Sequence, residues 1–155
     1  MEEQVQQRKV IVFQLQDESY ALTVDQVGSI ERMLPITRIP QAPDFVKGVI
    51  NLRGVVTPVI DLKARFGMAA AEPGEASRII VVSLANMEVG LIVDTANDVL
   101  DIPDNAIEPP PEVVNAVDVD YIEGVAKHDD RLIILLHLQN VLASVEMMHL
   151  KSVQG

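Results

Sequence analysis

Residues 45–62 read FVKGVINLRGVVTPVIDL, in which two runs rich in β-branched residues flank the pair Arg53-Gly54. Apolar runs of this length around a two-residue turn predict a β-hairpin. Asp61 follows the second run as the expected N-cap of a short helix, and Gly67 stands where that helix is expected to end. The stretch therefore predicts a strand, a turn, a second strand and a short helix.

This unit occurs twice in the chain. Residues 121–138, YIEGVAKHDDRLIILLHL, repeat it at an offset of 76. Further upstream, residues 11–25 match residues 80–94 at an offset of 69, which also aligns Ile30 with Val99. Two diverged copies of one supersecondary unit explain both matches.

Glycine is retained between the copies where the turn residues are not. Gly48 aligns with Gly124, which indicates a shared backbone requirement such as a positive φ, a bulge or the close approach of another strand. Gly54 suits a left-handed conformation at the second turn position. Arg53 aligns with Asp129, so the shared architecture cannot require arginine at the first position.

A role in binding is therefore expected for Arg53. An arginine at a turn tip offers a planar fork of donors to a carboxylate of a partner. The alternative is an intramolecular salt bridge from Arg53 to the acidic second half of the chain, which would fix the angle between the two lobes.

Several short strands at this spacing predict an all-β fold with one small β-barrel lobe per copy of the repeat. Neither copy alone is long enough to bury a sufficient core, so a single domain with a shared interface is expected. The expected boundaries are lobe one at about 8–67, a linker at about 68–77, lobe two at about 78–138 and a C-terminal helix at about 139–150.

The chain of 155 residues has a net charge of −11 and no cysteine. The charge repels nucleic acid, and the lack of cysteine excludes disulfides and agrees with a reducing compartment. Without a basic and apolar leader or an apolar run of about 20 residues, a cytoplasmic protein with no direct membrane insertion is expected. Residues 8–66 carry +2 and residues 78–146 carry −10, so the two halves should meet different partners.

No catalytic, cofactor-binding or metal-binding residues are expected. The histidines His128, His137 and His149 lack metal-ligand spacing, and no phosphate-binding or nucleophile motif occurs. Most carboxylates lie in the second half at expected caps and turns, where a solvated surface accounts for them. An interaction module remains; a small-molecule-binding β-barrel and a carboxylate-dependent enzyme are the alternatives from other classes.

The block FVKGVINLRG at residues 45–54, followed by PVIDL at 58–62 and by Arg65-Phe66, resembles the chemotaxis coupling protein (CheW) family. The resemblance covers nearly the whole chain. One departure is Ser29, where the family pattern V-x-E-I has glutamate. No role for a carboxylate is therefore carried over to that position.

The resemblance implies two intertwined, SH3-like, five-stranded barrels that form a non-catalytic adaptor without cofactors. The implied partners are the cytoplasmic signalling tips of chemoreceptors (methyl-accepting chemotaxis proteins) and the regulatory domain of the histidine kinase CheA, which would recruit the protein to membrane receptor arrays. A coupling protein of another chemosensory array, such as one for surface motility, is the alternative within the family.

Family analogy places the kinase on the first lobe and the receptor near the junction of the lobes. Carried over residue by residue, the resemblance implies protein-binding roles for Val24, Val27, Ile30, Asn51, Arg53 and Gly54. For the three apolar residues, packing in the core is the other interpretation.

Overall fold

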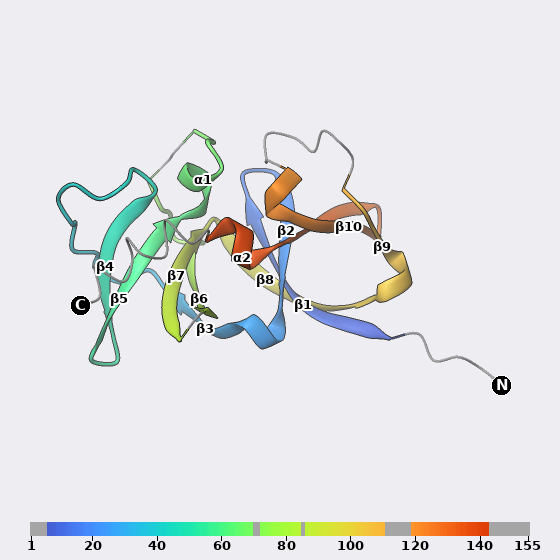
Figure 1. The fold of residues 1–155 in the computed structure, drawn as a ribbon, viewed down its shortest axis with the longest axis horizontal. Coiled ribbons are helices and arrows are strands. Elements are labelled where there is room, and N and C mark those ends of the chain that lie inside the picture. Colours follow the sequence, from blue (N-terminus) through green and yellow to red (C-terminus); the bar gives the residue numbers. More distant parts are fainter. Residues whose placement is uncertain (1–5, 70–71, 85, 111–118, 143–155) are drawn as a thin grey trace.

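The computed structural model shows a protein built almost entirely of short β-strands (Figure 1). It describes residues 6–69, 72–84, 86–110 and 119–142. The strands within these ranges are β1 (Gln7–Leu15), β2 (Glu18–Thr23), β3 (Val27–Arg32), β4 (Val46–Leu52), β5 (Val55–Asp61), β6 (Arg78–Leu84), β7 (Met87–Val93), β8 (Thr95–Pro103), β9 (Ile107–Glu108), β10 (Ile122–His128) and β11 (Arg131–Leu136). Single helical turns connect them: η1 (Val24–Gln26), α1 (Leu62–Arg65), η2 (Asp104–Ala106), η3 (Val119–Tyr121) and α2 (Leu138–Val141).

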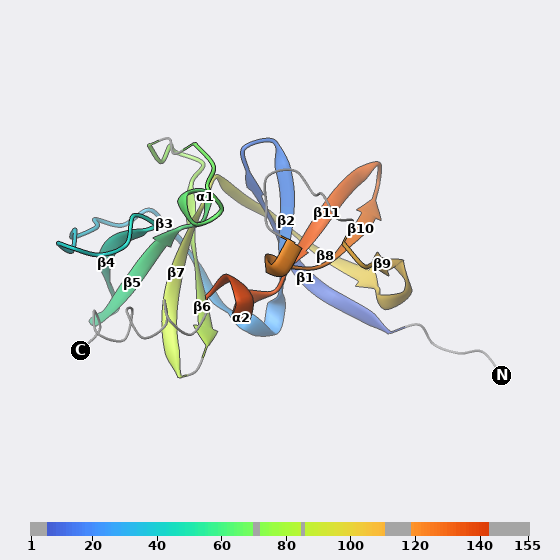
Figure 2. The ribbon, with the colours of Figure 1, turned by 45° about the horizontal axis from the view of Figure 1, so that its top comes forward.

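The strands form two sheets that lie side by side (Figures 1 and 2). One sheet has six strands in the order β8-β1-β2-β11-β10-β9, and the other has five in the order β3-β6-β7-β5-β4. We call them lobe A (residues 6–26, 95–110 and 119–142) and lobe B (residues 27–69, 72–84 and 86–94). The all-β prediction is confirmed, with open curved sheets in place of closed barrels, and lobe A gains a sixth strand from the two-residue β9.

The two lobes differ from the contiguous lobes expected at about 8–67 and 78–138. The hairpin β1–β2 of the first copy joins lobe A, while β6–β7 of the second copy joins lobe B. The segment expected as a linker at 68–77 leads from α1 to β6, both of which belong to lobe B. The chain crosses between the lobes at Val24–Gln26 and at Asp94 instead, because each copy lends its first hairpin to the other.

Parallel pairings between the copies hold this exchange together. Val59 of β5 pairs with Gly90 of β7, and Leu135 of β11 pairs with Ala21 of β2. Leu135 follows Val59 by 76 residues and Gly90 follows Ala21 by 69, which are the two offsets of the sequence repeat. The molecule is therefore related to itself by an approximate twofold axis between the lobes.

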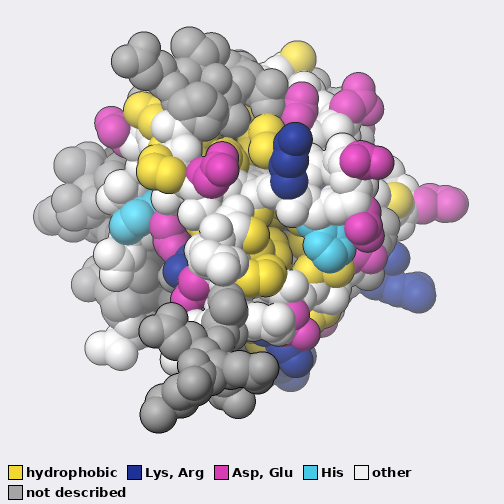
Figure 3. Space-filling view, turned by 90° about the vertical axis from the view of Figure 1, so that its right-hand side faces the viewer, with side chains coloured by type: hydrophobic (Ala, Val, Ile, Leu, Met, Phe, Trp, Pro, Cys, Tyr) yellow, Lys and Arg dark blue, Asp and Glu magenta, His cyan; other side chains and the backbone are white. Residues whose placement is uncertain are grey.

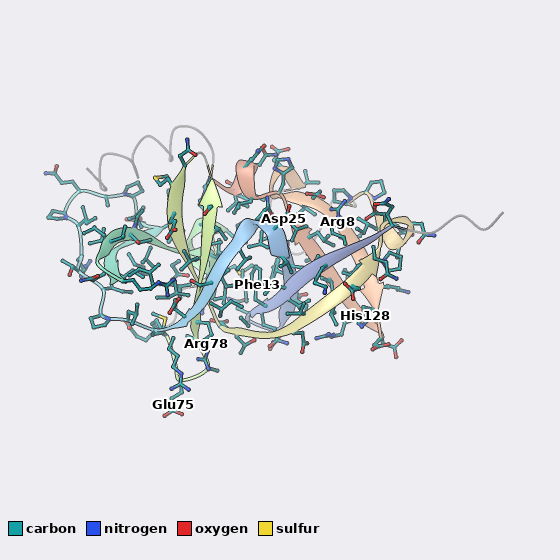
Figure 4. The ribbon with its side chains drawn as sticks, turned by 90° about the horizontal axis from the view of Figure 1, so that it is seen from below. Arg8, Phe13, Asp25, Glu75, Arg78 and His128 are labelled. Carbon is teal, nitrogen blue, oxygen red and sulfur yellow. The ribbon has the colours of Figure 1, made fainter. Side chains whose placement is uncertain are left out.

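One apolar cluster runs through both lobes. It contains Phe13 and Tyr20 from lobe A together with Ile80 and Leu91 from lobe B, all fully buried. Figure 4 shows Phe13 near the middle of the molecule, where the lobes meet. Burial of each such side chain contributes roughly 1.5–3 kcal/mol, so the shared core explains why neither copy needs to be stable alone.

The paired glycines meet the backbone requirement expected of them. The register of each hairpin shifts at the glycine, between Val46 and Gly48 and between Ile122 and Gly124. A Cβ atom at Gly48 would lie 2.0 Å from the carbonyl oxygen of Thr37, and one at Gly124 would lie 2.6 Å from a side-chain carbon of Ile107. Both positions therefore combine a bulge with the close approach of another segment.

The predicted short helix is also confirmed. The side chain of Asp61 accepts a hydrogen bond from the backbone N–H of Lys63, and Gly67 has a φ of 77° just beyond the end of α1. Near the C-terminus, α2 ends at Val141. The helix expected at about 139–150 lies outside the described residues from position 143 onward.

Candidate docking surfaces

Arg53 and Gly54 form the two-residue turn between β4 and β5. Their φ angles are 52° and 87°, so both central residues adopt the left-handed conformation of a type I′ turn. The conformation predicted for Gly54 is confirmed, and it extends to Arg53, where a side chain raises the energy by roughly 1–2 kcal/mol. Asp129 and Asp130 form the equivalent turn in lobe A, with φ angles of 50° and 63°.

The Arg53 side chain reaches the edge strand β3. Its Nη1 lies 3.2 Å from Oε2 of Glu31, while 70% of the Arg53 side chain remains exposed. Because Glu31 belongs to lobe B and to the first half of the sequence, the predicted alternative of a salt bridge to the acidic second half is wrong. An exposed pair of this kind contributes roughly 0–1 kcal/mol and leaves the guanidinium accessible to a partner.

Asn51 holds the same turn from inside the hairpin. Its Oδ1 accepts a hydrogen bond from the backbone N–H of Gly54 at 2.7 Å. Two of the six predicted binding residues, Asn51 and Gly54, therefore have a defined structural role in presenting Arg53.

The three apolar candidates separate in the structure. Val24 is half-buried in η1, and Val27 packs against the shared core. Ile30, on the outward face of β3, is 40% exposed and precedes Glu31 in the ion pair with Arg53. Ile30 is thus the sequence neighbour of the residue that pairs with Arg53, with its side chain on the other, exposed face of β3, whereas Val27 lies roughly 13 Å from Glu31 along the strand.

A matching surface on lobe A was not predicted from the sequence. Nη2 of Arg131 lies 3.4 Å from Oδ2 of Asp98, which ties the β10–β11 hairpin to β8 as Arg53 ties β4–β5 to β3. The neighbouring Val99 and Leu132 are 59% and 45% exposed. The repeat offsets contained the signal, because they align Val99 with Ile30 and Leu132 with the exposed Val56.

Charge distinguishes these two similar surfaces. The described residues of lobe B hold seven Lys/Arg and seven Asp/Glu, whereas those of lobe A hold four and eleven. Figure 3, seen toward the end of lobe A, shows Asp and Glu side chains around exposed apolar side chains. The charge difference between the sequence halves therefore survives the hairpin exchange as a neutral lobe B and an acidic lobe A.

The family model of the CheW-like domain matches residues 9–146. This chain belongs to the CheW-like domain family. It is 42% identical over 134 residues to the chemotaxis protein CheW of Bacillus subtilis (strain 168), with 86% of each chain covered. It is 38% identical over 139 residues to the chemotaxis protein CheW of Rhizobium meliloti (strain 1021), with 90% of each covered.

A solved member of the family has the same fold. The crystal structure of the scaffolding protein TtCheW from Thermoanaerobacter tengcongensis superposes with a TM-score of 0.84 at 41% identity. The match covers 91% of this chain and 96% of that one. The exchange of hairpins therefore belongs to a fold for which an experimental example exists.

Tyr20 is a titratable group in the core of this CheW-like chain, and its pKa is clearly shifted. Burial and, to a smaller extent, the carboxylate of Glu18 raise the pKa of Tyr20 to about 12. The ring stacks on Phe13 with centroids 6.0 Å apart, and the hydroxyl has no hydrogen-bond partner among the described residues. This environment keeps the phenol neutral inside the core, away from any surface where a partner could reach it.

Three further features of the CheW-like fold bear on small-molecule binding, metal binding and membrane insertion. A hollow of about 780 Å³ is lined by the loop between β3 and β4 and by Glu72, Pro73 and Ile92, and none of the six predicted binding residues lines it. Over the described parts of the chain, no group of three His, Asp or Glu side chains is placed to hold a metal ion. None of the helices in those parts is long and apolar enough to cross a membrane.

Proposed function

We propose that this CheW-like protein is a non-catalytic adaptor that couples the cytoplasmic tips of chemoreceptors to the regulatory domain of the histidine kinase CheA. Membership of the family makes it a chemotaxis scaffold protein. The assignment of these two partners, and recruitment to receptor arrays through them, is the finer part of the proposal. The observation that carries it is the presence of two similar exposed surfaces of different charge on one molecule.

Arg53 and Ile30 are the residues that we assign to partner binding on lobe B. Arginine is a poor choice for a left-handed turn position, which glycine or asparagine fills without strain. The ion pair with Glu31 offsets little of that strain because it is exposed. A contact with a partner explains why arginine occupies the turn, whereas Val27 and Asn51 act indirectly by supporting β3 and the turn.

The proposal is tested by reconstituting the kinase with the cytoplasmic fragment of a receptor and measuring kinase autophosphorylation. We expect activation only when this protein is present. Arg53→Ala should lower the affinity for one partner by roughly tenfold or more, as loss of an interface arginine commonly does. Asp129→Ala, at the same turn position of lobe A, is the matched control and should leave that affinity unchanged.

A wild-type protein that binds neither the kinase nor the receptor fragment would contradict the adaptor function. Normal activation by Arg53→Ala would remove Arg53 from the docking surface. Both measurements use the full chain, since each lobe contains strands from both halves of the sequence.

A further inference from the structure

Arg65, at the end of α1, contacts both lobes at once. Its Nε donates a hydrogen bond to the backbone carbonyl of Val141 in α2 at 2.9 Å. Its guanidinium carbon lies 5.0 Å from the ring centroid of Phe45 in lobe B and 4.9 Å from that of Tyr121 in lobe A. The cation is thus held between two aromatic rings, one from each side of the interface.

The sequence repeat relates the residues that Arg65 contacts to each other and to Arg65 itself. Tyr121 follows Phe45 by 76 residues, and Val141 follows Arg65 by the same offset. Arg65 therefore lies between two equivalent aromatic residues and donates to the carbonyl of its own equivalent. These contacts place it on the approximate twofold axis that relates the copies.

A residue on such an axis can be charged in only one copy. If both copies carried arginine here, two guanidinium groups would compete for the same space between Phe45 and Tyr121 and would repel each other. The second copy instead has Val141, which is 1% exposed. Because the surroundings of the two equivalent positions are symmetric, only one of them can hold a cation. That position is Arg65, and its equivalent is the apolar Val141.

Two neighbours of Arg65, Lys63 in α1 and Phe66 directly after it, extend the contact between the lobes. Nζ of Lys63 lies 2.7 Å from Oδ1 of Asp94, and Oδ2 of Asp94 accepts a hydrogen bond at 2.7 Å from the backbone N–H of Gln16 in lobe A. The ring of Phe66 lies 6.2 Å from Tyr20, which also belongs to lobe A. One helical turn of lobe B is thus joined to lobe A at three points.

The directional contacts differ from the apolar core in what they can specify. The free energy of apolar burial is non-directional, so the core restricts the relative rotation of the lobes only through the fit of its side chains. A planar guanidinium that donates a hydrogen bond and lies against two ring faces is satisfied only over a narrow range of angles. Arg65 therefore supplies the orientation that the core alone does not define.

We propose that Arg65 is a positioning residue that fixes the angle between lobe A and lobe B, and with it the relative orientation of their exposed surfaces. The consequence for coupling rests on the proposed adaptor function. In the alternative interpretation of Arg53, a salt bridge from that residue would fix the angle between the lobes. We assign this role to Arg65, 12 positions later.

The angle between the lobes can be measured directly by double electron–electron resonance. Because the chain has no cysteine, Ser83→Cys in lobe B and Lys127→Cys in lobe A accept two spin labels on exposed strand positions without further changes. Arg65→Met, which keeps a long apolar stem, should broaden or shift the interlobe distance distribution. Arg65→Lys, which keeps the cation, should retain much of the wild-type distribution.

A second label pair separates reorientation from unfolding. Lys9→Cys with Lys127→Cys lies entirely within lobe A, and its distance should be the same in Arg65→Met as in the wild type. An interlobe distribution that stays unchanged in Arg65→Met would overturn the proposal. A change of the pair within lobe A would also overturn it, since Arg65 would then maintain the fold of that lobe.

Function is measured on the same variants. Arg65→Met should bind the kinase and the receptor fragment separately with affinities within about threefold of wild type, and should lose roughly tenfold of kinase activation when both are present. A changed angle with full activation would overturn the link between orientation and coupling. If the wild type itself fails to activate, the adaptor function is rejected while the distances still decide the role of Arg65.

Discussion

The hairpins β4–β5 and β10–β11 have the same I′ turn, the same bulge and a glycine at the same place, yet one turn carries Arg53-Gly54 and the other Asp129-Asp130. Features of the backbone are shared because both hairpins must bend around another segment of their lobe. Among the side chains that differ, those at the turn tips lie on the surface and Arg65 lies on the axis between the copies, while those of other pairs, such as Thr57 and Ile133, are fully buried. The duplicated fold is thus conserved internally where geometry demands it and has diverged where partners or symmetry act.

The largest expected effect comes from the shared glycines. Gly48→Val should destabilise the protein by about 3 kcal/mol or more, because the new side chain collides with backbone at Thr37. Gly124→Val should cost less, since the nearest backbone atom to its new Cβ, the carbonyl oxygen of Glu108, lies at 2.9 Å instead of 2.0 Å, and the closer atom is a side-chain carbon of Ile107. Urea denaturation midpoints compare the two. An unchanged midpoint for Gly48→Val would show that the hairpins share a sequence coincidence and no backbone requirement.

The twofold axis is tested by exchanging its asymmetric pair. Val141→Arg should cost about 2 kcal/mol or more, since it buries a second cation close to Arg65. Combining it with Arg65→Val should recover about 1 kcal/mol or more, because the single cation can then occupy the site from the other copy. A double-mutant cycle by denaturant titration measures the coupling. Purely additive effects would contradict the placement of Arg65 on the axis.

Tyr20 sharpens the comparison within the core, since its equivalent in the second copy is the fully buried Val89. Tyr20→Phe removes a hydroxyl without a partner and should stabilise the protein by about 1 kcal/mol at neutral pH. The folded-state pKa of about 12 exceeds the ordinary tyrosine pKa of 10.0, so the folded state retains a proton that the unfolded state releases. Stability should therefore fall as the pH rises from 10 towards 12, and this part of the loss should be absent in Tyr20→Phe.

Calorimetric melting across that pH range measures the difference. Tyr121, the second of the two tyrosines, remains in both proteins and serves as the internal control. Identical pH profiles for the wild type and Tyr20→Phe would contradict the assigned burial of the hydroxyl.

The smallest effect is expected at the turn tips. Arg53→Gly relieves a left-handed arginine but removes the ion pair with Glu31, so the two changes should nearly cancel to within about 0.5 kcal/mol. Asp129→Gly relieves the same conformation in lobe A and provides the comparison. A loss well above 1 kcal/mol for Arg53→Gly alone would make the ion pair structural and weaken the case for binding.

Local features of this fold could be predicted from the sequence because neighbouring residues determine them. The hairpin around Arg53-Gly54, the cap at Asp61 and the bulged glycines each depend on a few adjacent positions. The exchange of hairpins between lobes could not be predicted in the same way. Two similar copies present nearly the same apolar pattern to either partner, so local pattern does not distinguish pairing within a copy from pairing between copies.

The local features of the candidate site could likewise be predicted from the sequence, whereas its contacts between distant residues could not. The exposure of Arg53 followed from its place in a turn, but its partner Glu31 depends on how the sheet curves back towards β3. Ile30 is exposed and Val27 packs on the core although both are apolar residues of the same strand, and a bulge at Gly28 shifts the register between them. Arg65 was part of the motif that carries the family resemblance, but its position between the lobes could not be predicted, since Phe45 lies 20 positions before it and Tyr121 and Val141 lie 56 and 76 positions after it.

The order in which strands are made has a consequence for synthesis on the ribosome. Lobe B is continuous in sequence and can close as soon as β7 has emerged, whereas β1 must wait for β8, which begins at Thr95, directly after lobe B. At about 5–20 residues per second, the first hairpin remains without its neighbours on both edges for several seconds. Lobe B, in the middle of the polypeptide, should therefore fold first on the ribosome. The hairpin β1–β2 is synthesised earlier but should pair with the other strands of its sheet only later.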